Sequence, residues 1–272
     1  MKMMKVKGFT LVELLVVISI IAMLLSILMP SLNKARKAAQ GVVCGSNQRQ
    51  LSMGMRLYSE NNKGRAPAFG MAAGDYWQYK IAPYLNSKEY AKDPVKALKS
   101  GMATMLCPST KRQPPGITSM GIYYNYGTAK LAWRNLEGTG TGSGYSDGSY
   151  GLNLWLAPEF TAFSGAFPTR KCWPMYSVVP RAASVPVFGD CNWVGGWPDG
   201  DNFATRNTDT GIQWGASNQE NLGRYLLSRH GRAINVAFVD GHGEKVPLYK
   251  LWDLKWCVGY KKTYTIPSWF MK

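Results

Sequence analysis

The chain has 272 residues, 46% of them hydrophobic, so it is long enough to bury a core beyond any N-terminal segment. Its 29 glycines and 15 prolines, many of them in the second half, favour short strands and turns over a helical bundle. The formal net charge of +16 favours contact with anionic glycans, DNA or lipid head groups. No groove-reading motif or Lys/Arg cluster accompanies this charge, so specific nucleic-acid binding is not expected.

The first predicted element is a helix of membrane length over residues 9–30. At about 1.5 Å per residue, these 22 residues extend roughly 33 Å, enough to cross the hydrocarbon core of a bilayer. The polar residues within it are Thr10, Glu13, Ser19 and Ser26. Basic residues flank both ends, and they are Lys2, Lys5, Lys7, Lys34, Arg36 and Lys37. These flanks leave the orientation open. A carboxylate inside such a span is costly and marks a function with a partner, so Glu13 is the most informative residue.

Two simpler interpretations explain this segment less well. A secretory signal peptide has an apolar core of about 7–15 residues, whereas this apolar run is longer and lacks a clean Ala-x-Ala-like cleavage site. A plain membrane anchor leaves Glu13 unexplained, together with the placement of Gly8 before Phe9.

The start of the span resembles a known processing signal. The run Lys7-Gly8-Phe9-Thr10-Leu11-Val12-Glu13-Leu14-Leu15-Val16-Val17-Ile18 is similar to the class III signal of type IV pilins and type II secretion pseudopilins. The resemblance implies cleavage between Gly8 and Phe9 by a prepilin peptidase, N-methylation of Phe9, and assembly with other pilin or pseudopilin subunits at an inner-membrane platform. It also implies that Glu13, the fifth mature residue, acts in assembly, and that Pro30 lies where many such helices carry a helix-kinking proline.

Cleavage after Gly8 would give Glu13 a partner. It creates an ammonium group on Phe9, about one helical turn from Glu13 in the same chain and accessible to Glu13 of a neighbouring subunit. Two isolated charges in hydrocarbon are each costly, and pairing removes much of that cost. We therefore expect this pair to set subunit register more than to add stability. The leader also carries three lysines, so its loss lowers the formal charge from +16 to +13 before the new amine is counted.

The helix is expected to continue over residues 31–62. Apolar residues recur there at helical spacing, namely Leu32, Ala35, Ala39, Val43, Leu51, Met55 and Tyr58. Three glycines weaken this part and allow bends, namely Gly41, Gly45 and Gly54. The run Asn61-Asn62-Lys63-Gly64 is typical of a helix end. The predicted organisation is a leader at 1–8, a membrane and assembly helix at 9–30, its soluble continuation at 31–62 and a globular β-rich head at 63–272.

Landmarks after the membrane helix narrow the resemblance to the large pilin-like proteins of planctomycete-type and related bacteria. These landmarks are Cys44–Leu51, Gly64–Pro67, Leu106–Ser109, Tyr123–Gly127, Arg181–Asp190, and His230 followed after nine residues by Asp240-Gly241. The resemblance implies an α+β fold in which the long helix packs its second half on an antiparallel β-sheet head with long loops. Residues 181–190 are expected to form a strand that ends in Asp190.

Two segments of the head are expected to form loops. Residues 136–149 are rich in Gly and Ser and predict a flexible surface loop. Residues 193–202 place Trp193 and Trp197 among Asp and Asn side chains. These indoles would either stack on a sugar ring or another flat ligand, or cap the hydrophobic core.

The C-terminal part predicts a hairpin that two interpretations fit. Residues 233–239 and 243–248 predict strands joined by the turn signal Asp240-Gly241. One interpretation is a metal site for zinc or a similar ion, formed by His230, Asp240 and His242 with Asp190 as a fourth ligand. In the other, His230 hydrogen-bonds a loop, Asp240 caps its own turn and His242 is exposed. An extended strand would hold His230 roughly 30 Å from the turn, which favours the second interpretation.

Five cysteines are present, and an exported head would meet an oxidising compartment. They are Cys44, Cys107, Cys172, Cys191 and Cys257. The odd number leaves at least one thiol free, and no Cys-x-x-Cys motif signals a zinc ribbon or a redox pair. Disulfides between Cys172 and Cys191, and between Cys44 and Cys107, are two pairings that remain open.

No catalytic set is evident in the sequence. It lacks Gly-x-Ser-x-Gly, His-Glu-x-x-His and a phosphate-binding loop, so we expect no enzyme and no cofactor apart from a metal ion at the C-terminal set. We expect a single-pass inner-membrane precursor, surrounded by membrane lipid, with its head in the periplasm. It would then join a type IV pilus-like or type II secretion filament in the periplasm or at the cell surface. The alternatives are an anchored adhesin that binds glycans through Trp193 and Trp197, and an anchored metal-dependent enzyme that uses the C-terminal histidines.

Overall fold

The computed structural model describes residues 10–68, 76–85, 103–113, 124–137, 144–157, 171–205, 207–211 and 218–271. The chain divides into two compact units, Met1–Ala39 and Gln40–Lys272. The division falls inside the long N-terminal helix, after the residues predicted to span a membrane and before the first residue that the structure buries, Cys44.

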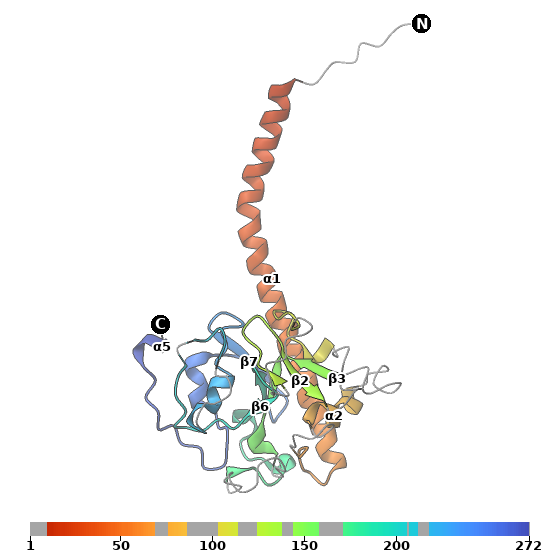
Figure 1. Cartoon of the computed structure of the whole chain (residues 1–272), viewed down its shortest axis with the longest axis vertical. Coiled ribbons are helices and arrows are strands. Elements are labelled where there is room, and N and C mark those ends of the chain that lie inside the picture. The colour runs from red at the N-terminus through yellow and green to blue at the C-terminus, as the bar shows by residue number, and fades with distance from the viewer. Residues whose placement is uncertain are drawn as a thin grey trace. The chain divides into compact units, whose positions relative to one another are not determined.

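The N-terminal helix α1 runs from Leu11 to Asn61, which confirms the prediction of one long helix (Figure 1). It continues through Pro30 and through all three glycines that were expected to weaken it. It ends where the sequence predicted, because Lys63 and Gly64 both adopt positive φ angles, 56° and 77°. Gly64 is required here, since a Cβ at this position would collide with Ser177.

The buried face of α1 differs from the predicted apolar stripe. Leu51 and Met55 are buried as expected, but Leu32 and Val43 are 69% and 48% exposed. The buried face consists of Cys44, Asn47, Gln48, Leu51, Ser52, Gly54, Met55 and Ser59. Polar residues belong to it because the head supplies partners: Asn47 Nδ2 donates to Leu106 O at 3.0 Å, and Ser52 Oγ donates to Phe238 O at 3.1 Å. A search for apolar periodicity alone misses such a face.

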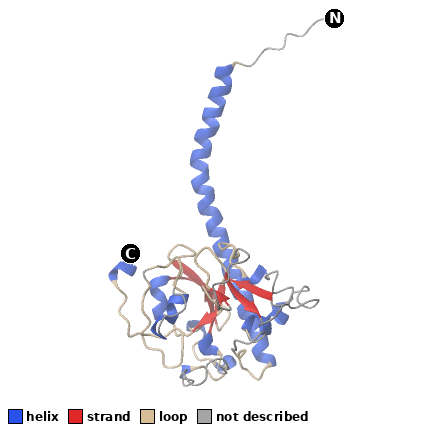
Figure 2. Cartoon of the chain, in the orientation of Figure 1, coloured by secondary structure: helices blue, strands red, loops and turns tan. Residues whose placement is uncertain are grey.

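A five-stranded sheet lies in the head, with its strands in the order β6-β4-β5-β7-β8. Figure 2 shows the strands of the head in red among its helices and loops. The strands are β4 (Tyr150–Asn153), β5 (Pro186–Asp190), β6 (Gly195–Gly196), β7 (Ala233–Phe238) and β8 (Gly243–Pro247). The α+β architecture is as predicted. The predicted strand over residues 181–190 ends in Asp190 as expected but begins only at Pro186, because Ala182–Ser184 form the 3-10 turn η6. Neighbours are antiparallel except β4 and β6, so the sheet is mixed and not wholly antiparallel. Strands β7 and β8 form the predicted hairpin, with Gly241 at a φ of +93° in its turn.

A three-stranded antiparallel sheet lies in the same unit. It contains β1 (Tyr124–Asn125), β2 (Trp133–Glu137) and β3 (Gly144–Gly148) in that order. Residues 136–149 were predicted to be a flexible loop, and this was wrong for both ends, where Glu137 pairs with Gly144. Residues 138–143 lie outside the described residues. The sheet holds the buried Arg134–Asp147 ion pair, in which Nε and Nη2 contact the two carboxylate oxygens at 2.6 and 2.8 Å. Composition suggested a loop because residues 136–149 are rich in Gly and Ser, which are also typical of loops.

Short helices and buried tryptophans complete the head. The short helices are α2 (Trp77–Ile81), α5 (Ser268–Met271), and the 3-10 turns η1 (Ala82–Leu85), η2 (Ala103–Met105), η3 (Leu154–Leu156), η5 (Tyr176–Val178), η6 (Ala182–Ser184), η7 (Asn218–Arg224) and η8 (Leu248–Asp253). Trp77, Trp252 and Trp256 are fully buried, and each donates its indole N–H to a backbone carbonyl at 2.7–2.8 Å. These bonds remove the cost of burying a polar N–H, so each ring contributes its full apolar surface to the core.

We predict that Arg134→Met destabilises the head by about 3–5 kcal/mol, because it leaves the Asp147 carboxylate buried without its cation. The measurement is urea unfolding of the full chain in detergent, with tryptophan fluorescence as the signal. Arg56→Met is the matched control, since Arg56 pairs with Glu60 on the surface at 66% and 55% exposure. That substitution should cost less than about 1 kcal/mol. Equal losses for the two variants would contradict the prediction.

Candidate functional sites

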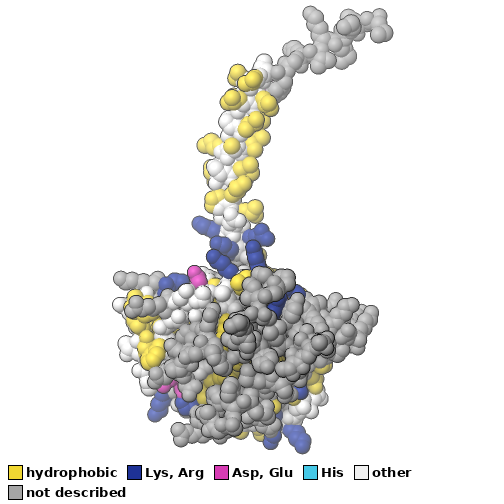
Figure 3. All heavy atoms as spheres, in the orientation of Figure 1, with side chains coloured by type: hydrophobic (Ala, Val, Ile, Leu, Met, Phe, Trp, Pro, Cys, Tyr) yellow, Lys and Arg dark blue, Asp and Glu magenta, His cyan; other side chains and the backbone are white. Residues whose placement is uncertain are grey.

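The first candidate site is the N-terminal half of α1. Among the described residues, α1 is the one helix long and apolar enough to cross a membrane. Apolar side chains from Leu11 to Met29 are exposed along it, and basic side chains follow them (Figure 3). These basic residues are Lys34, Arg36 and Lys37. An exposed apolar surface of this length, bordered by basic residues, is suited to a lipid environment.

Glu13 caps its own helix. Its Oε2 accepts hydrogen bonds from the Thr10 backbone N–H at 2.9 Å and from Thr10 Oγ1 at 2.8 Å. Thr10 Oγ1 in turn accepts from the Glu13 backbone N–H at 3.3 Å. This reciprocal pair is a capping box of the Thr-x-x-Glu type, a signal that the sequence carried and that we did not use. Gly8 and Phe9, the predicted processing residues, lie outside the described residues.

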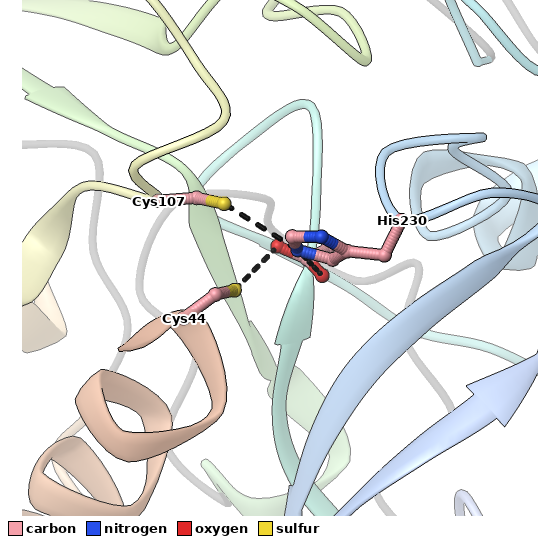
Figure 4. Close-up of side chains that lie close together, drawn as sticks. Cys44, Cys107 and His230 are labelled. Atoms are coloured by element: carbon pink, nitrogen blue, oxygen red, sulfur yellow. Dashed lines mark hydrogen bonds and ion pairs between the residues drawn. The ribbon is translucent and has the colours of Figure 1, made fainter. Parts of the chain in front are cut away.

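The second candidate site is a buried cluster in the head, formed by Cys44, Cys107, Asp190 and His230 (Figure 4). One sulfur, nitrogen or carboxylate oxygen from each residue lies within 4.8 Å of the others. Four separate segments supply them. Cys44 lies on α1, Cys107 follows η2, Asp190 ends β5, and His230 lies in the turn that precedes β7. That turn is closed by a bond from His230 N to Ala233 O at 3.2 Å.

The Asp190 carboxylate is the centre of the contacts in this cluster. Its Oδ1 accepts from Arg229 Nη1 at 3.0 Å and from Cys44 Sγ at 3.4 Å. Its Oδ2 accepts from the Asn235 backbone N–H at 2.9 Å and lies 3.4 Å from His230 Nε2. The side chains of Asp190 and Arg229 are both fully buried, so this ion pair is screened little by water. Arg229 also donates to the carbonyls of Ser149 and Thr128, at 2.5 and 2.9 Å.

The two thiols of the cluster have different proton affinities. Burial raises the pKa of the Cys44 thiol well above its ordinary value, and its hydrogen bond to Cys107 adds to this. The same hydrogen bond, with a further one from His230, lowers the pKa of Cys107 to about 6 against the effect of burial. Burial opposes a charged imidazole, but Cys107 and Asp190 together raise the pKa of His230. Cys107 is therefore the sulfur most ready to act as a thiolate.

The structure brings together only some of the metal ligands that were predicted from the sequence. His230 lies with Asp190, the residue considered as a fourth ligand, but Asp240 and His242 lie outside the cluster. Asp240 Oδ1 accepts from the His242 backbone N–H at 3.1 Å and contacts His242 Nδ1 at 2.6 Å. Both side chains are exposed, and the imidazole stacks on Phe238 at 4.3 Å. This is the alternative arrangement that strand geometry favoured: a capped turn with an exposed histidine.

All five cysteines are thiols in the structure, so neither predicted pairing is formed. Cys44 and Cys107 do come together, at the cluster. Cys191 is fully buried, and burial raises the pKa of its thiol to about 12. Cys172 lies instead on a segment beside Cys257, since Val258 N donates to Lys171 O at 3.0 Å.

The two tryptophans predicted as a ligand platform belong to the core. Trp193 and Trp197 are 2% and 6% exposed. The guanidinium of Arg224 lies over both rings, at 4.4 Å and 5.9 Å from their centroids. A sugar needs an open aromatic face, so this finding supports the core interpretation over the glycan-binding one.

One comparison with known proteins gives a match. Residues 3–29 match a family model described as the prokaryotic N-terminal methylation motif. The chain begins with a prepilin-type segment. That segment supports a pilin-like, membrane-anchored subunit that a prepilin peptidase processes, and the match includes Gly8, Phe9 and Glu13. No curated protein and no solved structure matches the chain. The likeness of the head to planctomycete-type proteins stays a prediction.

We predict that Asp190→Asn destabilises the head by about 3–5 kcal/mol, because it leaves Arg229 buried without an anion and turns an amide N–H₂ toward other donors. Asp240→Asn is the matched control and should cost less than about 1 kcal/mol, since its partner His242 is exposed. Urea unfolding of the two full-length variants measures the difference. Similar midpoints for both variants would show that the cluster does not depend on Asp190.

Proposed function

We propose that this protein is a structural subunit of a type IV pilus-like or type II secretion filament. A prepilin peptidase would cleave it after Gly8, its new N-terminus at Phe9 would be methylated, and α1 would then join other subunits. The observation that carries the proposal is the methylation motif at residues 3–29, placed directly before an exposed apolar helix with a single acidic residue in its membrane-length part.

Glu13 differs from the other polar residues of that part of α1. Ser19 and Ser26 each donate to a carbonyl one turn earlier, Val16 O and Met23 O, at 2.7 Å. Their hydroxyls are therefore satisfied within the helix and cost little in lipid. The carboxylate of Glu13 accepts two hydrogen bonds from Thr10, but no positively charged group of the described residues, which begin at Thr10, pairs with it. A cation is still needed to make a buried carboxylate inexpensive.

Processing would supply this cation at the adjacent end of the helix. The new amine of Phe9 lies next to Thr10, the residue that already binds Glu13. In a filament, the amine of one subunit and Glu13 of another would form an ion pair inside the apolar core. Such a pair leaves two uncompensated charges when the helices shift along each other, so it would select one register.

The described parts of the head favour a structural role over the two alternatives. Glycan binding would need an open aromatic face, and Trp193 and Trp197 offer none because both are buried. The cluster around Asp190 is buried as well, which suits a role in stability better than access for a substrate. We further propose that the precursor crosses the inner membrane once, with residues 34–37 at one lipid boundary and the head in the periplasm.

We predict that the mature protein begins with N-methyl-phenylalanine at position 9. Mass spectrometry of protein from cells that contain the matching prepilin peptidase should show loss of residues 1–8 and gain of one methyl group. Cells without the peptidase should retain the full-length chain. A mature N-terminus at any other residue would contradict the proposed processing.

We predict that Glu13→Leu and Glu13→Gln are both inserted and cleaved but both fail to assemble. Gln can replace Glu in a capping box, so Glu13→Gln keeps the cap and removes only the charge. Thr10→Val removes the two hydrogen bonds of the hydroxyl group and keeps the charge, and it should assemble. Ser26→Leu, a polar-to-leucine change in the same helix, is the matched control and should also assemble. Filament yield after shearing, measured by microscopy and immunoblot, separates these outcomes. Wild-type yield from either Glu13 variant would refute a role for its charge.

A further inference from the structure

We propose that Cys44, Cys107, Asp190 and His230 bind one structural Zn²⁺ ion inside the head. This inference concerns the head alone and does not depend on filament assembly. It keeps His230 and Asp190 from the metal set that the sequence suggested, and it replaces the hairpin residues by two cysteines.

The spacing of the four side chains fits the coordination sphere of zinc. Tetrahedral zinc with Zn–S bonds of about 2.3 Å and Zn–N or Zn–O bonds of about 2.0 Å holds its ligand atoms roughly 3.3–3.8 Å apart. Cys107 Sγ lies 3.4 Å from His230 Nε2, His230 Nε2 lies 3.4 Å from Asp190 Oδ2, and Asp190 Oδ1 lies 3.4 Å from Cys44 Sγ. The Cys107–His230 and His230–Asp190 contacts therefore already have the spacing that a bound zinc requires. Cys44 Sγ contacts the other oxygen of the carboxylate, and one ligand atom from each of the four residues lies within 4.8 Å of the others. Figure 4 shows the two sulfurs and the imidazole pointing toward one another.

The donor types also fit zinc. Two sulfurs and one imidazole favour zinc over magnesium or calcium, which prefer oxygen ligands. Binding would displace two protons to solvent, one from Cys44 and one from the hydrogen-bonded Cys107–His230 pair, giving two thiolates and a neutral imidazole. Zn²⁺ and the Arg229 guanidinium then carry three positive charges, against three negative charges on two thiolates and the Asp190 carboxylate. A buried site with no net charge avoids most of the penalty for burying ions.

Neighbouring groups are placed to orient the ligands. Asp190 is held by Arg229 Nη1 on one oxygen and by Asn235 N on the other. The backbone N–H of Ser109 points at Cys107 Sγ, with a nitrogen–sulfur distance of 3.4 Å, and Gln48 Nε2 lies 3.8 Å from Cys44 Sγ. N–H donors to sulfur stabilise the thiolate form, and carboxylates held by hydrogen bonds are typical of metal ligands.

The site would be structural because all four positions are filled by side chains. Each of the four residues is buried, so neither water nor substrate has an open coordination position. The ion would join residue 44 on α1 to the η2 turn, to the end of β5 and to the start of β7. It would also hold both thiols away from oxidation in an oxidising compartment.

The test is the metal and thiol content of the full-length protein, purified in mild detergent without added chelator. Elemental analysis should find about one zinc per chain. Thiol titration in denaturant with chelator should find all five cysteines reduced. Metal-free protein would overturn the proposal. Three thiols instead of five would show that one disulfide has formed, and peptide mapping would show whether it joins Cys44 to Cys107. Another metal in stoichiometric amount would overturn the assignment to zinc.

Substitutions inside and outside the cluster test whether the zinc ion is bound at these four residues. Cys107→Ser and His230→Gln should each lose at least about nine-tenths of the bound zinc, whereas Cys172→Ser, a cysteine outside the cluster, should keep it. If the first two variants fail to fold, wild-type protein decides the question by exchange of zinc for Co²⁺. Coordination by the two thiolates should then produce intense sulfur-to-cobalt charge-transfer absorption. Its absence, or retention of zinc by a folded His230→Gln protein, would refute the site.

Discussion

The Asp190 carboxylate is the contact on which the arrangement of the head depends. It receives Arg229 and Asn235 as donors and lies against Cys44 and His230, so one buried anion organises groups from α1, β5, β7 and the turn before β7. A fully buried anion is unstable unless each of these groups is in place. The carboxylate therefore favours the native packing of α1 on the sheet over alternatives in which α1 slides or turns.

This constraint also explains the polar face that α1 presents to the head. An apolar face would tolerate small shifts along the helix axis, whereas hydrogen bonds fix the position of each residue. Asn47 binds Leu106 O, Ser52 binds Phe238 O, and Cys44 contacts Asp190. Each bond adds little net stability, but an unpaired polar group in the same place would be costly. The C-terminal part of α1, from Cys44 to Ser59, is thus held at one position along the sheet.

The same principle operates at the other end of α1, with a different outcome. Glu13 is also an anion in surroundings that suit apolar groups, and among the residues that the structure describes it has hydrogen bonds from Thr10 but no cation. In the head, the cation for Asp190 comes from the same polypeptide. In the proposed filament, the cation for Glu13 comes from another subunit. The Asp190 carboxylate would fix how the chain folds, and the Glu13 carboxylate would fix how chains assemble.

The sequence correctly predicted those elements that are specified by residues close together in the chain. The apolar run and its single acid predict the N-terminal span, the Asn61–Gly64 run predicts the end of α1, and Asp240-Gly241 predicts the β7–β8 hairpin. The two ends of residues 136–149 were misassigned, because a Gly/Ser-rich composition is typical of loops, whereas both ends pair with each other as strands. The Thr10–Glu13 capping box was present in the sequence and could have been recognised from its spacing.

The cluster in the head could not be predicted in the same way. Cys44 and Asp190 are 146 residues apart, and Cys107 and His230 are 123 residues apart. The four residues lie in different segments, and only strand order and helix register decide which of them meet. The sequence by itself determined a processed, membrane-length helix with an acid in need of a partner, because these properties depend on neighbouring residues. The tertiary structure alone decided that His230 meets two cysteines and Asp190, and not His242. An extended strand separates His230 from His242, which are close in sequence, whereas folding brings residues together that are far apart in sequence.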